Sequence, residues 1–233
     1  MYLNLLSGGA AKGLVAAMQP EFTAATGCDL HATFSAVGAM QDKLLAGEPC
    51  DVVILTAALI ETLARDGFVV ADTVVALGAV PTGVAVRAGE AWPDVSDGDA
   101  LRRTLLAASG IYVPDTERST AGIHVFKVLR SLGIDTEVAA RLRTWPNGAT
   151  AMLELSRTSE SRPIGITQVS EIITTPGVAL VGALPRGFDL ATVYSVAVCT
   201  KAREPELAQR LTRLLTSSDA GAARARTGFG QAT

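Results

Sequence analysis

Residues that could hold a small anion occur at three points where a predicted strand meets a predicted helix. Each point carries small or hydroxyl-bearing residues, in the runs Ser7-Gly8-Gly9, Ser35-Ala36 and Ser119-Thr120-Ala121. The N-terminus of a helix presents N–H groups without intrahelical partners and about half a positive charge. Hydroxyls add donors, and small residues let an anion approach the backbone. One such point is most simply an N-cap, but three at equivalent positions predict an anion-binding site.

Two further polar residues stand near predicted helix starts. Arg118 could form a bidentate pair with a carboxylate ligand, or it could be a surface residue paired with Glu117 or Asp115. Asn147 could cap the helix that follows it or face the ligand. The sequence leaves both alternatives open for each residue.

His124 and Tyr194 are titratable residues close to the predicted site. His124 lies in the first turns of the helix after Thr120. A histidine can act as an acid or a base near pH 7, although packing against the protein interior is the commoner role. Tyr194 lies in a predicted strand and could either reach the ligand or pack in the core with its hydroxyl bonded.

Other catalytic and metal-binding patterns are absent from the sequence. It contains no GxSxG, GxxxxGK[ST] or HExxH motif and only 2 histidines. The cysteines, Cys28, Cys50 and Cys199, are widely spaced and form no CxxC pair. We expect buried free thiols, with a disulfide or a reactive thiol as the less favoured alternative. The sequence therefore predicts no metal and no cofactor.

The composition indicates a globular protein with a small-molecule partner. Of the 233 residues, 48% are apolar and 18% are charged, and the net charge of −3 provides no general attraction to nucleic acids or acidic membranes. The longest uncharged segments, 73–86 and 172–185, are shorter than the ~20 residues that span a bilayer. The N-terminus lacks the basic region of a signal peptide. We expect a cytoplasmic protein if Met1 is the native start, and a periplasmic one if a leader was removed.

Predicted strands and helices alternate along the chain, which indicates a parallel sheet covered by helices. Apolar periodicity predicts strands at 2–6, 30–34, 52–55, 110–113 and 163–166 and helices at 10–26, 37–46, 57–66, 100–108, 121–132, 136–142, 149–155 and 204–215. Two β-rich segments, 74–86 and 192–199, suit strands that cross between lobes. They predict a discontinuous lobe of residues 1–80 plus 195–233 and an inserted lobe of residues 81–194.

The sequence resembles the bacterial molybdate-binding protein family, the type II solute-binding proteins of ABC transporters. The similarity lies in "LLSGGAAKGLVAAMQPEFTAATGCDL", "FSAVGAMQDKLLAGEPCDVVIL", "TERSTAGIHVFKVLRSLGI" and "SSDAGAARARTGFG", and it extends along nearly the whole chain. The resemblance implies an α/β fold of two Rossmann-like lobes around a ligand cleft, the type II periplasmic-binding-protein fold. It also implies an ABC transporter permease as a partner.

The resemblance further implies a tetrahedral oxyanion, such as molybdate or tungstate, held by hydroxyls and backbone amides without a metal. It assigns ligand contacts to Ser7, Ser35 and the amides of Thr120 and Ala121, and to the segment around Gln168. The family commonly has a tyrosine where this chain has Gln168, so a small carboxylate or another oxyanion is an equally open choice.

Two other functions are compatible with the same resemblance. The related proteins include isomerases that move a double bond in small unsaturated polycarboxylates such as aconitate. Such an enzyme would need one proton-shuttling residue, for which His124, Glu171 and Tyr194 are the candidates. The effector domain of a transcription regulator is the third reading, and no helix-turn-helix precedes the first predicted strand. We expect a binding protein, with the isomerase as the alternative.

Overall fold

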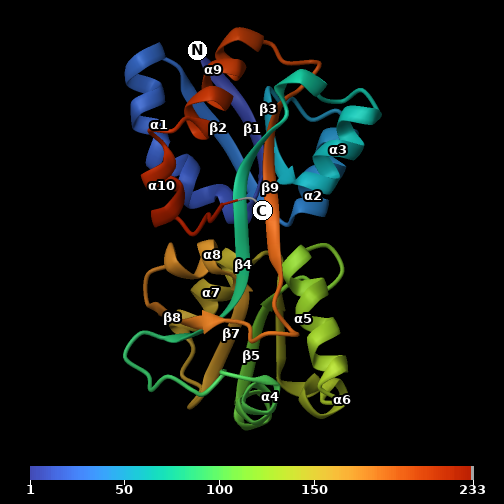
Figure 1. Cartoon of the computed structure of the whole chain (residues 1–233), viewed down its shortest axis with the longest axis vertical. Coiled ribbons are helices and arrows are strands. Elements are labelled where there is room, and N and C mark those ends of the chain that lie inside the picture. Colours follow the sequence, from blue (N-terminus) through green and yellow to red (C-terminus); the bar gives the residue numbers. More distant parts are fainter. Residues whose placement is uncertain (232–233) are drawn as a thin grey trace. The chain divides into compact units, whose positions relative to one another are not determined.

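The chain passes from one compact unit to another and then returns. The computed structural model describes residues 1–231. Unit 1 consists of the segments Met1–Val80 and Val193–Thr233, and unit 2 is Pro81–Thr192. The chain leaves unit 1 within strand β4 (Val75–Arg87) and returns to it within β9 (Ala191–Val198) (Figure 1). Both strands come from the β-rich segments of the sequence, and each has residues in both units.

The sheet of unit 1 is mainly parallel. Strand β1 (Tyr2–Gly8) lies between β2 (Asp29–Ser35) and β3 (Val52–Thr56) and is parallel to both. Strand β9 pairs with β3 in the antiparallel sense. Residues Val52, Val53, Ile54 and Leu55 are fully buried, because helices cover both faces of the sheet.

The helices of unit 1 form two groups on opposite sides of these strands (Figure 1). One group contains α1 (Lys12–Thr26), α9 (Pro205–Thr216) and α10 (Gly221–Arg226), and the other contains α2 (Val37–Leu45) and α3 (Ala57–Arg65). A 3-10 turn over Gly9–Ala11 precedes α1, and a second covers Ala71–Thr73. No helix within residues 1–231 combines the length and the apolar character needed to cross a membrane.

The sheet of unit 2 combines parallel and antiparallel strands. Strand β5 (Gly110–Pro114) is parallel to its neighbours β6 (Leu142–Trp145) and β7 (Pro163–Gln168). The unit 2 part of β4 is antiparallel to β7 and to β8 (Val178–Ala183). Strands β5, β6 and β7 therefore end at the same edge of the sheet.

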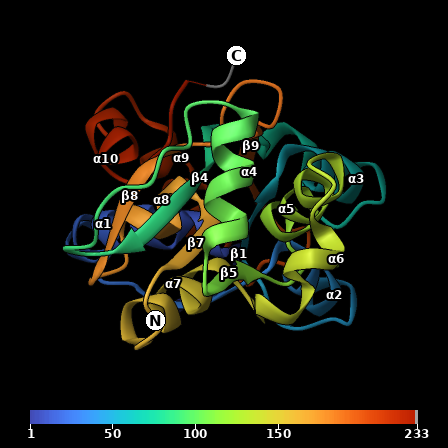
Figure 2. The same cartoon turned by 90° about the horizontal axis from the view of Figure 1, so that it is seen from below.

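Helices cover both faces of this sheet as well. Figure 2 shows α5 (Thr120–Ser131) and α6 (Asp135–Val138) together on one side of the strands and α7 (Gly148–Arg157) on the other. Successive residues of β5 alternate between two cores. One core contains Ile111 and Val113 with residues of α5, α6 and α4 (Gly98–Ala107), and the other contains Tyr112 with residues of α7 and α8 (Val169–Ile173).

The α/β class predicted from the sequence is confirmed, but one of the predicted helices is wrong. The predicted helix 136–142 is divided into α6, a 3-10 turn (Ala139–Arg141) and the strand β6. Residues 142–145 lack the continuous apolar run that predicts the strand 52–55, and they form a strand because they pair with β5. The elements α8, β8 and α10 are also absent from the predicted set.

Gly78 provides a test of how tightly β4 packs in unit 1. Its φ is +140°, and a Cβ atom at this position would lie 2.3 Å from the carbonyl oxygen of Gly230. We expect Gly78→Ala to lower the free energy of unfolding by about 1–3 kcal/mol, measured by chemical denaturation. Gly182→Ala is the control, because a Cβ atom there meets nothing within 4 Å. Equal stability of the two variants would contradict the packing described for Gly78.

Candidate functional site

Three helical segments begin at one edge of the unit 1 sheet. Gly8 and Ser35 are Cα partners at the ends of β1 and β2, and Thr56 ends β3. The N-cap residues that follow or coincide with these ends are Gly8, Ala36 and Thr56, and none of them forms a side-chain cap hydrogen bond. The first N–H groups of these segments therefore point from the carboxyl edge of the sheet without a side-chain acceptor.

Ser7 has a different environment from the one expected for a turn residue. The strand β1 continues through Gly8, two residues beyond the predicted end, so Ser7 lies within the sheet and is fully buried. Its hydroxyl donates to the carbonyl oxygen of Gly8 at 2.9 Å. Ser35, by comparison, is half-buried at the end of its strand. Of the two serines, Ser35 is thus the one that solvent can reach.

Packing explains why residue 8 is a glycine. A Cβ atom at Gly8 would lie 2.7 Å from Cγ1 of Val37 and 3.3 Å from Cε1 of Tyr194. Tyr194 is 3% exposed, packs edge to face on Phe229 at 6.1 Å, and is the Cα partner of Thr56. The structure therefore places Tyr194 beside the Gly8 end of β1.

Thr56 is a residue at this edge that the sequence analysis missed. It combines a hydroxyl with a strand-to-helix junction, as Ser35 does. This shared pattern was the signal that could have identified it, but the following residues, Ala57 and Ala58, include no glycine or second hydroxyl to draw attention to the junction.

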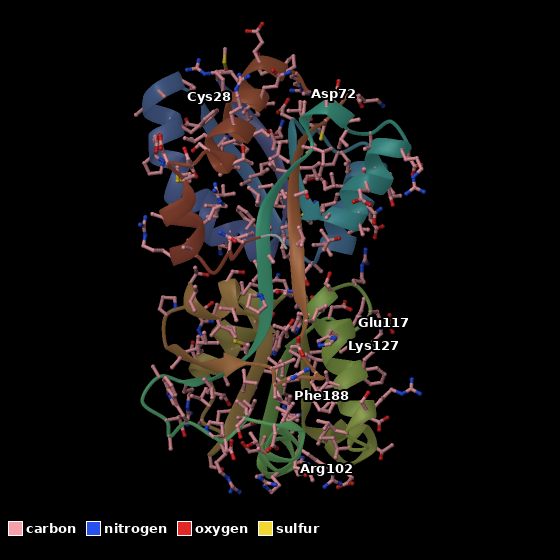
Figure 3. The ribbon with its side chains drawn as sticks, in the orientation of Figure 1. Cys28, Asp72, Arg102, Glu117, Lys127 and Phe188 are labelled. Carbon is pink, nitrogen blue, oxygen red and sulfur yellow. The ribbon has the colours of Figure 1, made fainter. Side chains whose placement is uncertain are left out.

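The N-terminus of α5 in unit 2 is ordered by a turn that centres on Asp115. Its carboxylate accepts hydrogen bonds from the backbone N–H groups of Glu117 at 2.8 Å and Arg118 at 2.9 Å. Ser119 is the N-cap residue but forms no side-chain cap bond. Thr120 is therefore the first residue of a helix whose N-terminus has no side-chain cap. Arg118 is exposed beside it, and Figure 3 shows Glu117 near the same helix end.

Asn147 adopts the first of its two predicted roles, that of a helix cap. Its side-chain oxygen accepts hydrogen bonds from the backbone N–H of Thr150 at 2.8 Å and from the Thr150 hydroxyl at 2.9 Å. This arrangement satisfies one of the orphan N–H groups of α7. Asn147 is thus engaged within its own helix.

A carboxylate of the chain itself occupies the remaining N–H groups at the start of α7. Glu171 is 6% exposed and accepts a hydrogen bond of 2.6 Å from the Thr167 hydroxyl. The backbone N–H groups of Ala149, Gln168 and Gly148 also donate to it. A Cβ atom at Gly148 would lie 1.9 Å from the Glu171 carboxylate, so only a glycine permits this approach.

Burial raises the pKa of Glu171 above its ordinary value, and the Thr167 hydroxyl and the backbone N–H groups oppose this effect. Glu171 is one of the three residues predicted as candidates for the proton shuttle of an isomerase. In the structure it is an internal ligand of a helix N-terminus, of the kind that an external anion could occupy elsewhere.

His124 is engaged with the chain segment before β9. Its Nε2 lies 2.7 Å from the carbonyl oxygen of Phe188, and because a carbonyl can only accept, Nε2 carries the proton. Phe188 lies beside α5 (Figure 3). This contact matches the packing role, and it leaves Nδ1 as the nitrogen that could accept a proton.

Gln168 belongs to a group of buried polar residues in unit 2. It is the Cα partner of Thr82 and donates from Nε2 to the Thr192 hydroxyl at 3.3 Å. Among the described residues, the Gln168 Oε1, the Thr82 hydroxyl and the Ser170 hydroxyl have no protein partner although they are buried. Each unpaired group costs about 1–3 kcal/mol. Such a group is suited to a bound water or to a polar ligand.

The surface pocket at the ends of β5 and β6 does not suit an anion. Its lining residues are Asp115, Thr116, Glu117, Thr144, Trp145 and Pro146. Two carboxylate side chains would repel a negatively charged ligand there. No group of three or more His, Cys, Asp and Glu side chains within residues 1–231 has an arrangement that could hold a metal ion.

The buried carboxyl of Glu171 generates a pH-dependent prediction. A pKa raised in the folded state contributes stability that is complete below the ordinary value of 4.5 and is lost as the pH rises through the raised pKa. Glu171→Gln removes this titration. We therefore expect the unfolding free energy of the wild type, minus that of the variant, to fall as the pH rises from about 4 to neutrality.

Thermal unfolding of the two proteins over this pH range measures the difference. Glu61→Gln, at an exposed position of α3, controls for the loss of a carboxylate as such. A difference that grows with pH would show that the hydrogen bonds to Glu171 outweigh its burial.

Comparison with known proteins agrees with this architecture. Residues 3–230 match the family described as bacterial extracellular solute-binding protein. A protein of Pseudomonas sp. named aconitate isomerase is 31% identical over 227 residues, which cover 95% of this chain and 84% of that protein.

Two solved structures have the same fold at low sequence identity. The periplasmic molybdate-binding protein of Azotobacter vinelandii has a TM-score of 0.82 at 16% identity, with 99% of this chain and 100% of that chain covered. The sulfate-binding protein SubI of Mycobacterium tuberculosis has a TM-score of 0.79 at 18% identity, with 98% and 86% covered. The chain therefore belongs to the bacterial extracellular solute-binding protein family and has the fold of the type II periplasmic binding proteins.

Proposed function

We propose that this protein binds a small anion through helix N-termini at the carboxyl edges of both sheets, as the solute-binding component of an ABC transporter. The observation that carries the proposal is the contrast among the helices that begin at the carboxyl edges of the two sheets. The helices α2, α3 and α5 begin without a side-chain cap, whereas α7 is closed by Asn147 and Glu171. The uncapped starts provide donors and positive potential where a ligand can use them.

The energy available from such donors is sufficient for tight binding. A hydrogen bond to a charged group contributes about 1.5–3 kcal/mol. Four or five of them can therefore support a micromolar complex of ~8 kcal/mol after the cost of association. No basic side chain or metal is required for this.

We further propose that the ligand is a small polycarboxylate rather than a tetrahedral oxyanion. The relative with 31% identity is named for aconitate, a tricarboxylate, whereas the structures of the molybdate- and sulfate-binding proteins support the fold at 16% and 18% identity. Arg118, beside the start of α5, supplies a guanidinium of the kind that pairs with carboxylates. Gln168 adds an amide whose polar atoms are not fully bonded.

The same relative favours a second candidate function, aconitate isomerisation. Moving a double bond along such a ligand requires a proton to leave one carbon and a proton to be added at the other end of the allylic system, without a redox step. Tyr194, beside Gly8, is better placed for this than Glu171, which is bonded to the start of α7. His124 would have to act through Nδ1.

A ligand panel tests the proposed ligand class. Molybdate, tungstate, sulfate and a set of di- and tricarboxylates are each added to the protein, and the melting temperature is measured. We expect the polycarboxylates to raise it and the tetrahedral oxyanions to leave it unchanged, with about 2.7 kcal/mol of stabilisation at a ligand concentration of ~100 Kd. Stabilisation by molybdate or tungstate alone would refute the polycarboxylate ligand.

Turnover separates the receptor from the enzyme. The protein is incubated with cis-aconitate or trans-aconitate, and the ligand is followed by proton NMR. A receptor leaves each ligand unchanged, and this is the expected result. Conversion of one into the other that disappears in Tyr194→Phe would establish the isomerase instead.

Substitutions in each unit test whether both sheet edges bind the ligand. Because the side chains of Ser35 and Ser119 do not cap their helices, Ser35→Ala and Ser119→Ala should retain the melting temperature of the free protein. We expect each to weaken binding roughly ten- to a hundredfold through the loss of one hydrogen bond to a charged group, measured by calorimetry. Ser131→Ala, at the exposed C-terminal end of α5, is the matched control. Unchanged affinity in either test variant would remove that residue from the site.

A further inference from the structure

Two buried cysteines from the two chain segments of unit 1 meet at one end of β3. Cys50 precedes β3 and Cys199 follows β9, and they are 7% and 2% exposed. The Cys50 thiol donates to the carbonyl oxygen of Val52 at 3.0 Å, and the Cys199 thiol is near enough to Cys50 for its pKa to be raised by this neighbour. The chain therefore holds an adjacent pair of thiols outside the candidate anion-binding site.

The backbone on both sides of this pair is held by further hydrogen bonds. The Cys199 N–H donates to the carbonyl oxygen of Asp51 at 2.9 Å, and the Arg203 N–H donates to the Asp51 carboxylate at 2.6 Å. Cys199 also forms an isolated β-bridge with Val69. Both thiols are thus fixed on ordered backbone rather than on a mobile loop.

The pair borders the surface of unit 1. Cys50 and Cys199 line the same surface pocket, together with Pro49, Phe68 and Lys201. Both cysteines therefore form part of the wall of a pocket that opens to solvent.

We propose that Cys50 and Cys199 form a reversible disulfide that joins the two segments of unit 1 covalently. The oxidant is a small-molecule disulfide such as oxidised glutathione. One cysteine thiolate attacks a sulfur of the oxidant and releases one small thiol, which leaves a mixed disulfide on the protein. The second cysteine thiolate attacks the protein sulfur of this adduct, forms the Cys50–Cys199 bond and releases a second small thiol. Two protein thiols are oxidised, and one disulfide is reduced.

The consequence follows from the order of the chain. All of unit 2, Pro81–Thr192, lies between the two cysteines, so the disulfide closes a loop that contains the inserted unit. Constraint of so long a loop removes much conformational freedom from the unfolded chain. Unit 1 would then keep its two segments together even when unit 2 opens or is cleaved.

The hydrogen bond to Cys50 and burial raise the pKa of the Cys199 thiol. Thiol–disulfide exchange needs a thiolate, so the oxidation is carried out at mildly alkaline pH on the folded, full-length protein. We expect the intact mass to fall by the two thiol hydrogens, and peptide mapping without reductant to join the peptides of Cys50 and Cys199. The oxidised protein should melt at a higher temperature than the reduced protein.

Cleavage in unit 2 provides a readout of the covalent link itself. Limited proteolysis within the exposed segment 88–96 should leave fragments that stay together on a non-reducing gel and separate on a reducing gel. Cys28→Ser is the matched control, because Cys28 lies in unit 1 away from β9 (Figure 3) and its substitution should change none of these results.

Three outcomes would overturn the proposal. They are a disulfide that includes Cys28, glutathione adducts without an internal bond, and fragments that stay linked in Cys50→Ser or Cys199→Ser. Because these two substitutions are buried, the melting temperature of each reduced variant shows whether it is folded. If the Cys50→Ser or the Cys199→Ser variant does not fold, the Cys28→Ser protein still provides the test, because it retains both Cys50 and Cys199.

Discussion

The exit of parallel strands at a common edge is the constraint on which the rest of this structure depends. Strands β1, β2 and β3 end side by side in unit 1, and strands β5, β6 and β7 do so in unit 2. A helical segment begins after each of these strands. Backbone N–H groups that no helix can satisfy internally are thereby gathered at one edge. They must be satisfied by side chains, water or a ligand. The helix starts of this chain differ in which of these partners they receive.

The chain satisfies α7 from within and leaves other starts without a side-chain cap. Asn147 bonds Thr150, and the buried carboxylate of Glu171 receives the N–H groups nearest the helix start. Gly148 is needed because any side chain would collide with that carboxylate. This internal complex shows that the fold can gather several hydrogen bonds onto one buried carboxyl group without a basic residue or a metal. An external carboxylate at α2, α3 or α5 would use the same interactions.

The two proposed functions share the binding step and differ in one requirement. A receptor needs only donors that match the charge of its ligand, whereas an isomerase also needs a group that exchanges protons with carbon. Glu171 is bonded to α7, and His124 donates to Phe188, so the titratable groups near the carboxyl edges are largely engaged with the protein. Such engagement favours binding over proton transfer.

The sequence by itself determined the α/β class and the positions of the strand-to-helix junctions, because periodicity and glycine or serine punctuation are local properties of the chain. It also identified Ser35, Ser119 and Asn147 as residues at helix starts. Only the tertiary structure decided which starts are occupied, since Glu171 reaches α7 across 22 residues of chain from Ala149. Likewise, residues 142–145 form a strand because β5 lies beside them, and Cys50 meets Cys199 because β3 pairs with β9. These contacts depend on the packing of segments that are distant in sequence, which no local pattern encodes.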